Sequence, residues 1–250
     1  MTNLRLIRSD GSGRIGNTIW HAASLPSTNS TLRELVLNGW AGHGAVVWAD
    51  EQTAGRGRLS RSWHSPAGGG LFVSVLIAGI EDRLVYCVAA LAVAGAIDEE
   101  TRLACSLKWP NDVLLDGRKV CGILMERIPE GAIVGIGINT NLSQAEVARI
   151  GPEAVSLLSA AGRPVDHQGL LERLIRHLEE QCIRSSRSSD LVFQDWKTAL
   201  VTLGQTVEVQ TTRETWLGQA VDVAVDGSLL VLNDKRLVRV YAADVRIRPQ

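Results

Sequence analysis

A β-hairpin in the middle of the chain is the local feature that most restricts its fold. Asp116-Gly117 stands between two apolar runs in residues 112–125, and an Asp-Gly pair in that setting favours a tight turn between antiparallel strands. Further strand-like segments lie at residues 45–49, 71–77 and 132–138, and helical patterns lie after residues 27–30 and at residues 84–97 and 170–178. Strands interleaved with helices, some joined by a hairpin, predict an α+β fold in which a mixed β-sheet is backed by helices.

Two details refine this prediction. Thr31 and Glu34 have the separation of a capping box, which places a helix start close to them. The Gly- and Arg-rich residues 55–70 lack a strand or helix period and are expected to form a loop.

The C-terminal part of the chain has a different pattern. From Thr206 onward apolar residues recur at every second position, and Asp226-Gly227 and Asn233-Asp234 mark turns. Five short strands are expected, at residues 206–210, 215–224, 228–232, 236–241 and 244–248. Because such strands suit a small β-barrel, we divide the chain into residues 1–202 and a small domain of residues 203–250.

Composition excludes several classes of protein. The 250 residues are 45% hydrophobic with a net charge of -1, so no overall field attracts nucleic acid or an anionic membrane. The apolar run at residues 84–97 is too short to span a membrane, and the N-terminus lacks the apolar core of a signal peptide. The four cysteines form no CxxC pair, which indicates reduced thiols and a cytoplasmic protein.

An arginine-rich segment, residues 51–66, is a candidate anion site. It reads EQTAGRGRLSRSWHSP, so guanidinium groups that match phosphate oxygens lie on a backbone loosened by glycines. A loop that closes over a phosphorylated ligand, with Trp63 against a base, is one interpretation. A solvated basic loop or a nucleic-acid tether is the alternative. Since GxxxxGK[ST] is missing from the sequence, ATP would not bind through a P-loop.

Two lysines near the hairpin form a second candidate. The chain has only four lysines (Lys108, Lys119, Lys197 and Lys235), and the hairpin returns Lys119 towards the Lys108-Trp109-Pro110-Asn111-Asp112 stretch. A lysine there can neutralise a carboxylate while it attacks and then stabilise charge on the leaving group. The alternative is a surface hairpin with incidental charges.

The segment GIGINTN, residues 135–141, is a third candidate. Glycines at alternate positions of a strand let a flat ligand approach the backbone, and Asn139 can bind an amide or a purine edge. A bulge or a packing device is the alternative. The five histidines show no metal-ligand spacing, and we assign no metal ligands.

Together these segments resemble the signatures of the biotin protein ligase family. They are Gly55-Arg56-Gly57-Arg58, Lys108 to Asp112 followed by Lys119 to Leu124, Gly135 to Asn139, and the helix entry Pro26-Ser27-Thr28-Asn29. The resemblance is strong over residues 20–142 and weak beyond. It implies a catalytic domain with a mixed sheet, followed by an SH3-like barrel.

The resemblance also implies a reaction. Members of the family form biotinyl-5'-AMP from biotin and MgATP and then transfer biotin to a lysine of a biotin carboxyl carrier domain of acetyl-CoA carboxylase or a related carboxylase. Lys119 and Arg58 would be catalytic. The biotin contacts would be Ser27, Thr28, Asn29, Gln52, Gly55, Arg56, Gly57, Arg58, Lys119, Gly122 and Gly137. The ATP contacts would be Arg58, Arg61, Trp63, Lys108, Asn111, Asp112 and Asn139.

The sequence departs from regulatory members of that family. Their N-terminal helix-turn-helix has no room before a signature that begins at Pro26, so we expect no specific DNA binding. We further expect no membrane association, and a monomer or a weak homodimer. A lipoate or octanoate protein ligase is the nearest rival, and the Gly-Arg-Gly-Arg loop favours biotin. A biotin sensor without catalysis would be expected to lack Lys119 or Arg58, and both are present.

Overall fold

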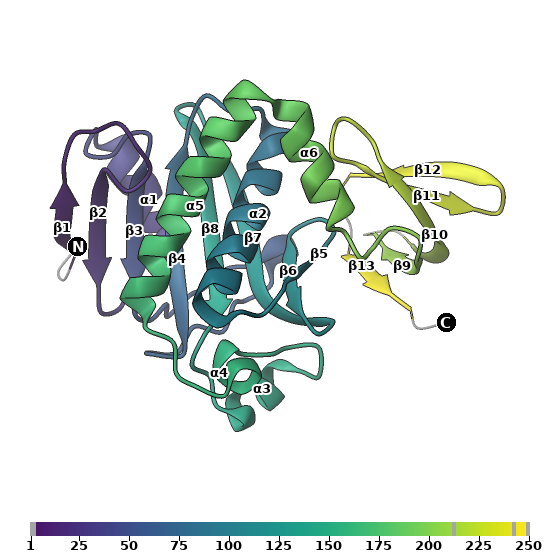
Figure 1. Cartoon of the computed structure of the whole chain (residues 1–250), viewed down its shortest axis with the longest axis horizontal. Helices are drawn as coiled ribbons and strands as arrows, with labels where there is room; N and C mark the ends of the chain where they lie inside the picture. Colours follow the sequence, from purple (N-terminus) through teal and green to yellow (C-terminus); the bar gives the residue numbers. More distant parts are fainter. Residues whose placement is uncertain (1–3, 212–213, 242–243, 249–250) are drawn as a thin grey trace.

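The computed structural model of the protein describes residues 4–211, 214–241 and 244–248. Its main element is an eight-stranded sheet in the order β1-β2-β3-β4-β8-β7-β6-β5, and a five-stranded sheet lies beyond the β5 edge (Figure 1). Strands β2 and β3 are parallel, and the other neighbouring pairs of the large sheet are antiparallel. The predicted α+β fold with a mixed sheet is confirmed.

The strands of the large sheet are β1 (Arg5–Ser9), β2 (Thr18–Ala22), β3 (Ala45–Ala49), β4 (Gly70–Ile77), β5 (Ser106–Lys108), β6 (Asp112–Leu115), β7 (Arg118–Ile128) and β8 (Gly131–Asn139). The predicted hairpin joins β6 to β7, with Leu115 opposite Arg118. Asp116 (φ 48°) and Gly117 (φ 73°) both have positive φ. That conformation is the one that a two-residue turn between twisted strands requires.

Helices cover both faces of this sheet (Figure 1). On one face, α2 (Asp82–Thr101) and α5 (His167–Arg187) pack against alternate side chains of β8, including Ile136 and Ile138. The apolar stripe predicted for residues 170–178 is the buried face of α5. On the other face, α1 (Thr28–Leu37) buries Leu32, Leu35 and Val36. The side chains of β8 that alternate with this core point to the α1 face, where the candidate site lies.

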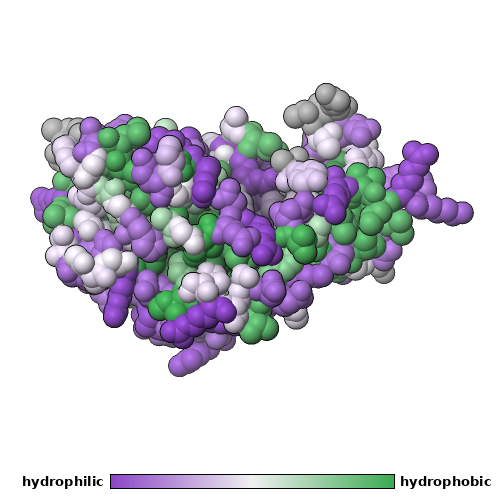
Figure 2. Space-filling model, turned by 90° about the horizontal axis from the view of Figure 1, so that it is seen from above, coloured by the Kyte–Doolittle hydropathy of each residue, from purple (hydrophilic) through white to green (hydrophobic). Residues whose placement is uncertain are grey.

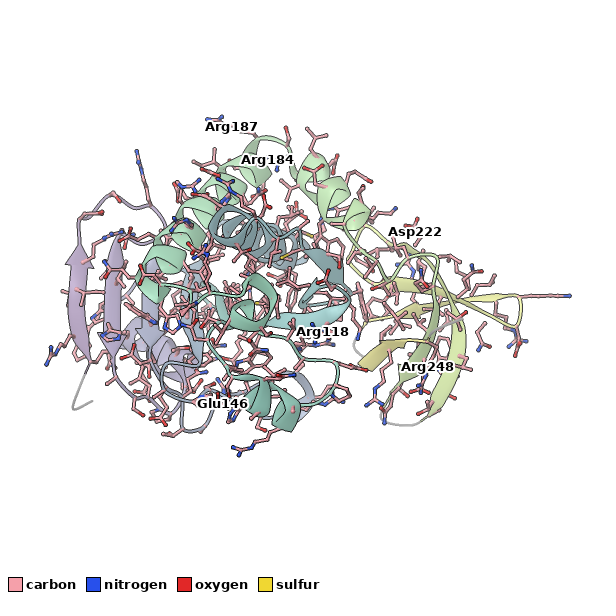
Figure 3. The ribbon with its side chains drawn as sticks, turned by 60° about the horizontal axis from the view of Figure 1, so that its bottom comes forward. Arg118, Glu146, Arg184, Arg187, Asp222 and Arg248 are labelled. Atoms are coloured by element: carbon pink, nitrogen blue, oxygen red, sulfur yellow. The ribbon has the colours of Figure 1, made fainter. Side chains whose placement is uncertain are left out.

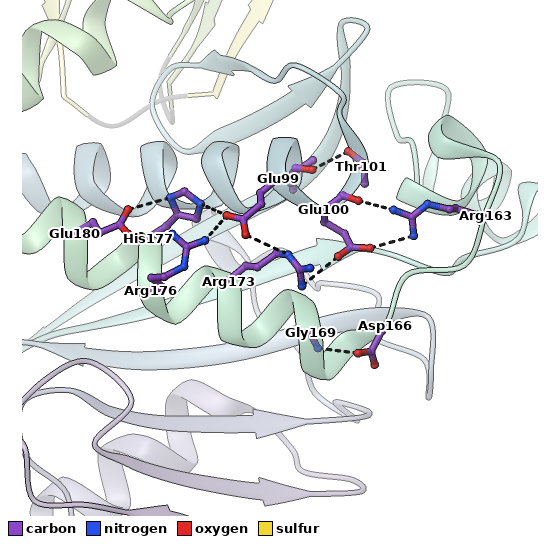
Figure 4. A network of polar contacts seen from close by, with 11 residues as sticks. Glu99, Glu100, Thr101, Arg163, Asp166, Gly169, Arg173, Arg176, His177 and Glu180 are labelled. Carbon is purple, nitrogen blue, oxygen red and sulfur yellow. Dashed lines mark hydrogen bonds and ion pairs between the residues drawn. The ribbon is translucent and has the colours of Figure 1, made fainter.

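An ion-pair network fixes α5 to the end of α2 (Figure 4). Glu99 pairs with Arg176 and His177, and Glu100 pairs with Arg163 and Arg173. The two helices approach closely because Gly95 faces the ring of His177, where an added Cβ would lie 2.8 Å from Nδ1. The helical layer behind the sheet is therefore held at its polar edge as well as through its core.

The C-terminal sheet contains the five predicted strands. They are β9 (Thr206–Gln210), β10 (Thr215–Val223), β11 (Leu229–Asn233), β12 (Arg236–Val240) and β13 (Asp244–Ile247), in the order β12-β11-β10-β9-β13. Their alternation buries Val207, Val209, Ala220 and Val231. Apolar side chains also gather on its outside, at the right of Figure 2, and the exposed ones include Leu217, Leu232 and Leu237.

The two sheets are joined by specific contacts. The indole of Trp109, which follows Lys108 and precedes a cis peptide bond to Pro110, donates from Nε1 to the Gly227 carbonyl at 3.0 Å. Lys197 lies 2.5 Å from Asp222, which projects from the C-terminal sheet in Figure 3. One end of the predicted catalytic stretch is therefore packed against a turn of the small domain.

Several elements were not predicted. They are β1, β2, β5, α3 (Gln144–Ile150), α4 (Leu157–Ala161) and α6 (Ser189–Thr198). The predicted capping box of Thr31 and Glu34 is wrong, because α1 begins at Thr28 with Ser27 as its N-cap residue. The predicted loop at residues 55–70 is confirmed apart from a short 3-10 helix, Arg58–Ser60, and the first residue of β4.

The four cysteines are free thiols, as predicted. Burial raises the pKa of Cys87, Cys105 and Cys182 to about 12, so these thiols stay protonated at neutral pH. Over the part of the chain that the structure describes, no helix is long and apolar enough to cross a membrane.

Candidate active site

A cavity of about 540 Å³ lies on the α1 face of the large sheet. It brings together the N-terminus of α1, the arginine loop, the hairpin and β8. Its lining includes these predicted residues: Ser27, Thr28, Asn29, Gln52, Arg56, Gly57, Arg58, Arg61, Trp63, Asn111, Asp112, Lys119, Gly122, Gly137 and Asn139. Gly55 and Lys108 are the two predicted residues outside this lining.

The polar end of the cavity is built on the start of α1. Ser27 lacks a side-chain capping bond to the helix, and the Oε1 of Gln52 instead accepts from the Thr28 backbone N at 2.9 Å and from Thr28 Oγ1 at 3.1 Å. Ser74 of β4 is fully buried and donates to Asn29 Oδ1 at 2.5 Å or to Thr28 Oγ1 at 2.7 Å. Since the side chains of Thr28, Asn29 and Gln52 already have hydrogen-bond partners, this end of the cavity is preorganised.

The arginine loop covers a second side of the cavity. Arg56 Nη1 lies 2.9 Å from Glu126 Oε1 of β7, and Arg58 Nη1 donates to Asn111 Oδ1 at 3.0 Å. Burial lowers the pKa of Arg58 despite the nearby Tyr86 and Asp112, yet a guanidinium remains charged at neutral pH. Arg56 therefore has a partner in β7, and Arg58 has a partner in the turn before β6.

Gly55 has a structural role in this loop. An added Cβ would lie 2.5 Å from the Trp63 carbonyl oxygen and 2.8 Å from Ser65 Oγ. The glycine therefore allows the two ends of the loop to cross closely, and the Gly55 carbonyl accepts from the Trp63 backbone N at 2.9 Å.

The hairpin places a cation and a carboxylate in the cavity. Lys119 Nζ lies 2.6 Å from Asp112 Oδ1. That oxygen is buried and, among the described residues, has no hydrogen bond of ordinary geometry, so we treat the contact as an ion pair. Lys119 Nζ also lies 5.2 Å from the centroid of the Trp63 ring, which is a cation–π distance.

The glycines of β7 and β8 form a flat floor under Trp63. An added Cβ at Gly122 would lie 2.8 Å from the indole, and one at Gly137 would lie 2.5 Å from its Nε1. This Nε1 is buried and without a hydrogen-bond partner among the described residues. The alternate glycines thus admit a flat group, and in this structure the group is Trp63, which covers two positions that sequence analysis assigned to biotin.

Residues that sequence analysis missed complete the cavity. They are Ser62, His64, Ile123, Leu124, Gly135, Ile136, Arg149, Ile150 and Ala154. Most lie within or beside the motifs, but Arg149, Ile150 and Ala154 come from α3 and the turn after it. The Nδ2 of Asn139 donates to the Val155 carbonyl at 3.2 Å, so the motif and this turn are held together.

Lys108 lies in a neighbouring cavity of about 400 Å³. That cavity shares Arg58, Arg61, Asp112 and Lys119 with the first and reaches Arg246 of β13. Basic side chains therefore continue from the main cavity to the small domain. Among the described residues, no cluster of three or more His, Cys, Asp or Glu could hold a metal ion.

The arrangement suits the joining of two anions. Lys119 and Arg58 supply positive charge where two negative reactants would otherwise repel each other. The flat glycine floor and the fixed amides of Asn29 and Gln52 suit a ring with polar edges. A loop that covers the cavity limits the access of water to a reactive product.

Comparison with known proteins agrees with this chemistry. Residues 21–143 match the Biotin/lipoate A/B protein ligase family, and residues 202–248 match the Biotin protein ligase C terminal domain. The fold and the cavity thus define a protein of the biotin and lipoate ligase class. Within that class, the match of the small domain favours the biotin protein ligases.

Individual relatives point the same way. The bifunctional ligase/repressor BirA of Bacillus subtilis is 32% identical over 240 residues, which cover 89% of this chain and 72% of the relative. The biotin--[acetyl-CoA-carboxylase] ligase of Mycobacterium tuberculosis is 31% identical over 89% of this chain and 86% of its own length. The biotin protein ligase of Aquifex aeolicus, solved in complex with biotin and ATP, has a TM-score of 0.78 and 28% identity, covering 93% of this chain and 99% of that chain. The chain belongs to the biotin protein ligase family.

Proposed function

We propose that this enzyme activates biotin with ATP and transfers it to a lysine of a carboxylase carrier domain. In the first step a biotin carboxylate oxygen attacks the α-phosphorus of ATP, biotinyl-5'-AMP forms, and pyrophosphate leaves. In the second step the carrier lysine amine attacks the acyl carbon, an amide forms, and AMP leaves. The observation that carries this proposal is the single cavity that gathers all four signature segments.

The residues divide between the two substrates. Ser27, Thr28, Asn29 and Gln52 would bind the polar ring of biotin, because they line the polar end of the cavity, where hydrogen bonds hold the side chains of the last three. Lys119 would lie between the carboxylate and the α-phosphate, with Arg58 beside it. For the floor glycines to carry biotin, Trp63 must move from Gly122 and Gly137, and its ring would then be free to pack on the base of ATP.

The cavity offers one carboxylate, Asp112, that suits a magnesium ion bound to ATP. Magnesium bound to ATP usually takes one or two protein carboxylates in addition to phosphate oxygens. Asp112 lines the cavity and has a buried carboxylate oxygen, so it is the residue that would hold the ion. The ion would reduce the negative charge of the phosphates.

The first step can be tested without a carrier. Purified protein with biotin, ATP and magnesium should give biotinyl-5'-AMP and pyrophosphate, because activation needs only the groups in this cavity. Mass spectrometry would detect the adenylate. Lipoate and octanoate, tested in parallel, serve as the competing substrates, and conversion of lipoate with no biotinyl adenylate would overturn the assignment to biotin.

We further propose a carrier domain of acetyl-CoA carboxylase or a related carboxylase as the protein partner, and a monomer or weak homodimer acting in the cytoplasm without specific DNA binding. Because the net charge of the chain is close to zero, we expect little general electrostatic attraction to DNA. The matching test pairs biotinylation of a carrier domain with DNA binding at physiological salt, since arginines give salt-sensitive attraction in dilute buffer. We expect transfer to the carrier and no sequence preference on DNA. A specific DNA complex that survives physiological salt would contradict the DNA part of this proposal.

A further inference from the structure

Glu126 of β7 is a partly buried carboxylate that the proposed reaction does not use, yet it connects two sides of the cavity. Its Oε2 accepts from Arg56 Nη2 at 3.0 Å, and its Oε1 forms an ion pair with Arg56 Nη1 at 2.9 Å. Its Oε2 also accepts from Asn29 Nδ2 at 3.0 Å, and Arg33 lies 3.6 Å away. With a side chain only 20% exposed, Glu126 links the arginine loop to the N-terminus of α1.

The Asn29 end of this link is rigid. The fully buried Ser74 hydroxyl lies 2.5 Å from Asn29 Oδ1, so both ends of the amide have a partner. The amide also lies against Gly135, where an added Cβ would be 2.4 Å from the same oxygen. Because Asn29 cannot shift easily, Glu126 is held in place and offers Arg56 a fixed bidentate partner.

The loop end of this link is strained. Leu59 (φ 54°) and Ser60 (φ 60°) follow one another in the left-handed region, which non-glycine residues adopt only when their surroundings enforce it. Hydrogen bonds from Arg56 to Glu126 and from Arg58 to Asn111 connect this loop to β7 and to the turn before β6. Local backbone hydrogen bonds, Gly57 N to Arg61 O at 2.7 Å and Arg61 N to Arg58 O at 3.1 Å, close this turn, and the contact of Arg56 with Glu126 holds it against β7.

We propose that Glu126 is a positioning residue that fastens the arginine loop over biotinyl adenylate until the carrier lysine arrives. It acts through Arg56 and touches no reacting atom. This inference rests on the proposed function, because the role given to Glu126 is to retain biotinyl adenylate. A released adenylate reacts with water to give biotin and AMP. A loop that opens too early would therefore consume ATP without transferring biotin.

The test uses the full chain with Glu126→Gln. Biotinyl adenylate should leave this variant about tenfold faster, the size expected from losing one charge-assisted contact. The chemical step, measured as adenylate formed in a single turnover, should change much less. Without a carrier, the variant should release more pyrophosphate in the steady state than the wild type. Its amide exchange over residues 55–62 should also be faster in the free protein.

Two comparisons separate positioning from general destabilisation. Asp82→Asn removes the partner of Arg127, an exposed ion pair at the next position of the same strand, and should leave adenylate release unchanged. Arg56→Gln should release adenylate as fast as the Arg56→Gln, Glu126→Gln double variant. Release from Glu126→Gln at the wild-type rate or slower, or additive effects in the double variant, would overturn the proposal. If the wild type forms no adenylate, the proposed function is wrong. Amide exchange over residues 55–62 would still test whether Glu126 holds the arginine loop.

Discussion

Replacing Lys119 with alanine should lower the rate of biotinyl adenylate formation by about 100-fold or more, the usual cost of one oriented charge-stabilising donor. Lys119 Nζ lies 2.6 Å from Asp112 in the cavity. Without it, the biotin carboxylate would approach the phosphate through uncompensated repulsion, and Asp112 would add further negative charge. Pyrophosphate release in the presence of biotin, ATP and magnesium measures this step.

A matched control is Lys197→Ala. Lys197 also forms an ion pair with an aspartate, Asp222, but at the junction with the small domain. Its loss should leave pyrophosphate release close to that of the wild type. If Lys119→Ala also stayed within about threefold of wild type, Lys119 would not stabilise charge in adenylate formation, because loss of one such donor costs about 100-fold or more.

The parts of the fold that sequence predicted are those fixed by local chemistry. The β6–β7 hairpin follows from Asp116-Gly117, whose positive φ values few other pairs tolerate. The C-terminal strands follow from period-two alternation, and no bound differs from the prediction by more than one residue. In such segments each residue favours locally the conformation that packing also requires.

The missed elements depend on tertiary contacts. Residues 5–9 carry exposed side chains throughout and form β1 only because they pair with β2. Helix α3 is seven residues long and buries only Val147, so it has almost no apolar stripe to reveal it. The start of α1 misled prediction because its cap comes from Gln52, which is distant in sequence.

The candidate site was predictable where a motif contains the side chain that lines it. Most of the residues predicted from the resemblance therefore line one cavity. Lys108 lies in the neighbouring cavity instead, because β5 pairs at the sheet edge next to the small domain. Ser74 and Glu126 were not predicted. They bind the side chains of Asn29 and Arg56, which are distant in sequence, and the spacing of residues within one segment does not reveal such contacts.

The tightest packing in the site gives the last prediction, Gly135→Ala. Gly135 stands opposite Ser74 in the sheet and faces Asn29, and a methyl group there would lie 2.4 Å from Asn29 Oδ1. Asn29 has no free direction in which to retreat, because Ser74 holds one end of its amide and Glu126 holds the other.

Overpacking of this kind costs about 1–3 kcal/mol. If the displaced Asn29 is a biotin contact, that cost should raise the dissociation constant for biotin by about 5- to 150-fold at 1.4 kcal/mol per tenfold change. Isothermal titration with biotin measures the change. Gly218→Ala is the control, because its methyl group would lie 2.6 Å from Val231 Cγ1 in the C-terminal sheet and should lower stability while leaving biotin affinity intact. Equal biotin affinity in Gly135→Ala and the wild type would mean that biotin does not depend on Asn29, and that the polar end of the cavity binds another part of the substrates.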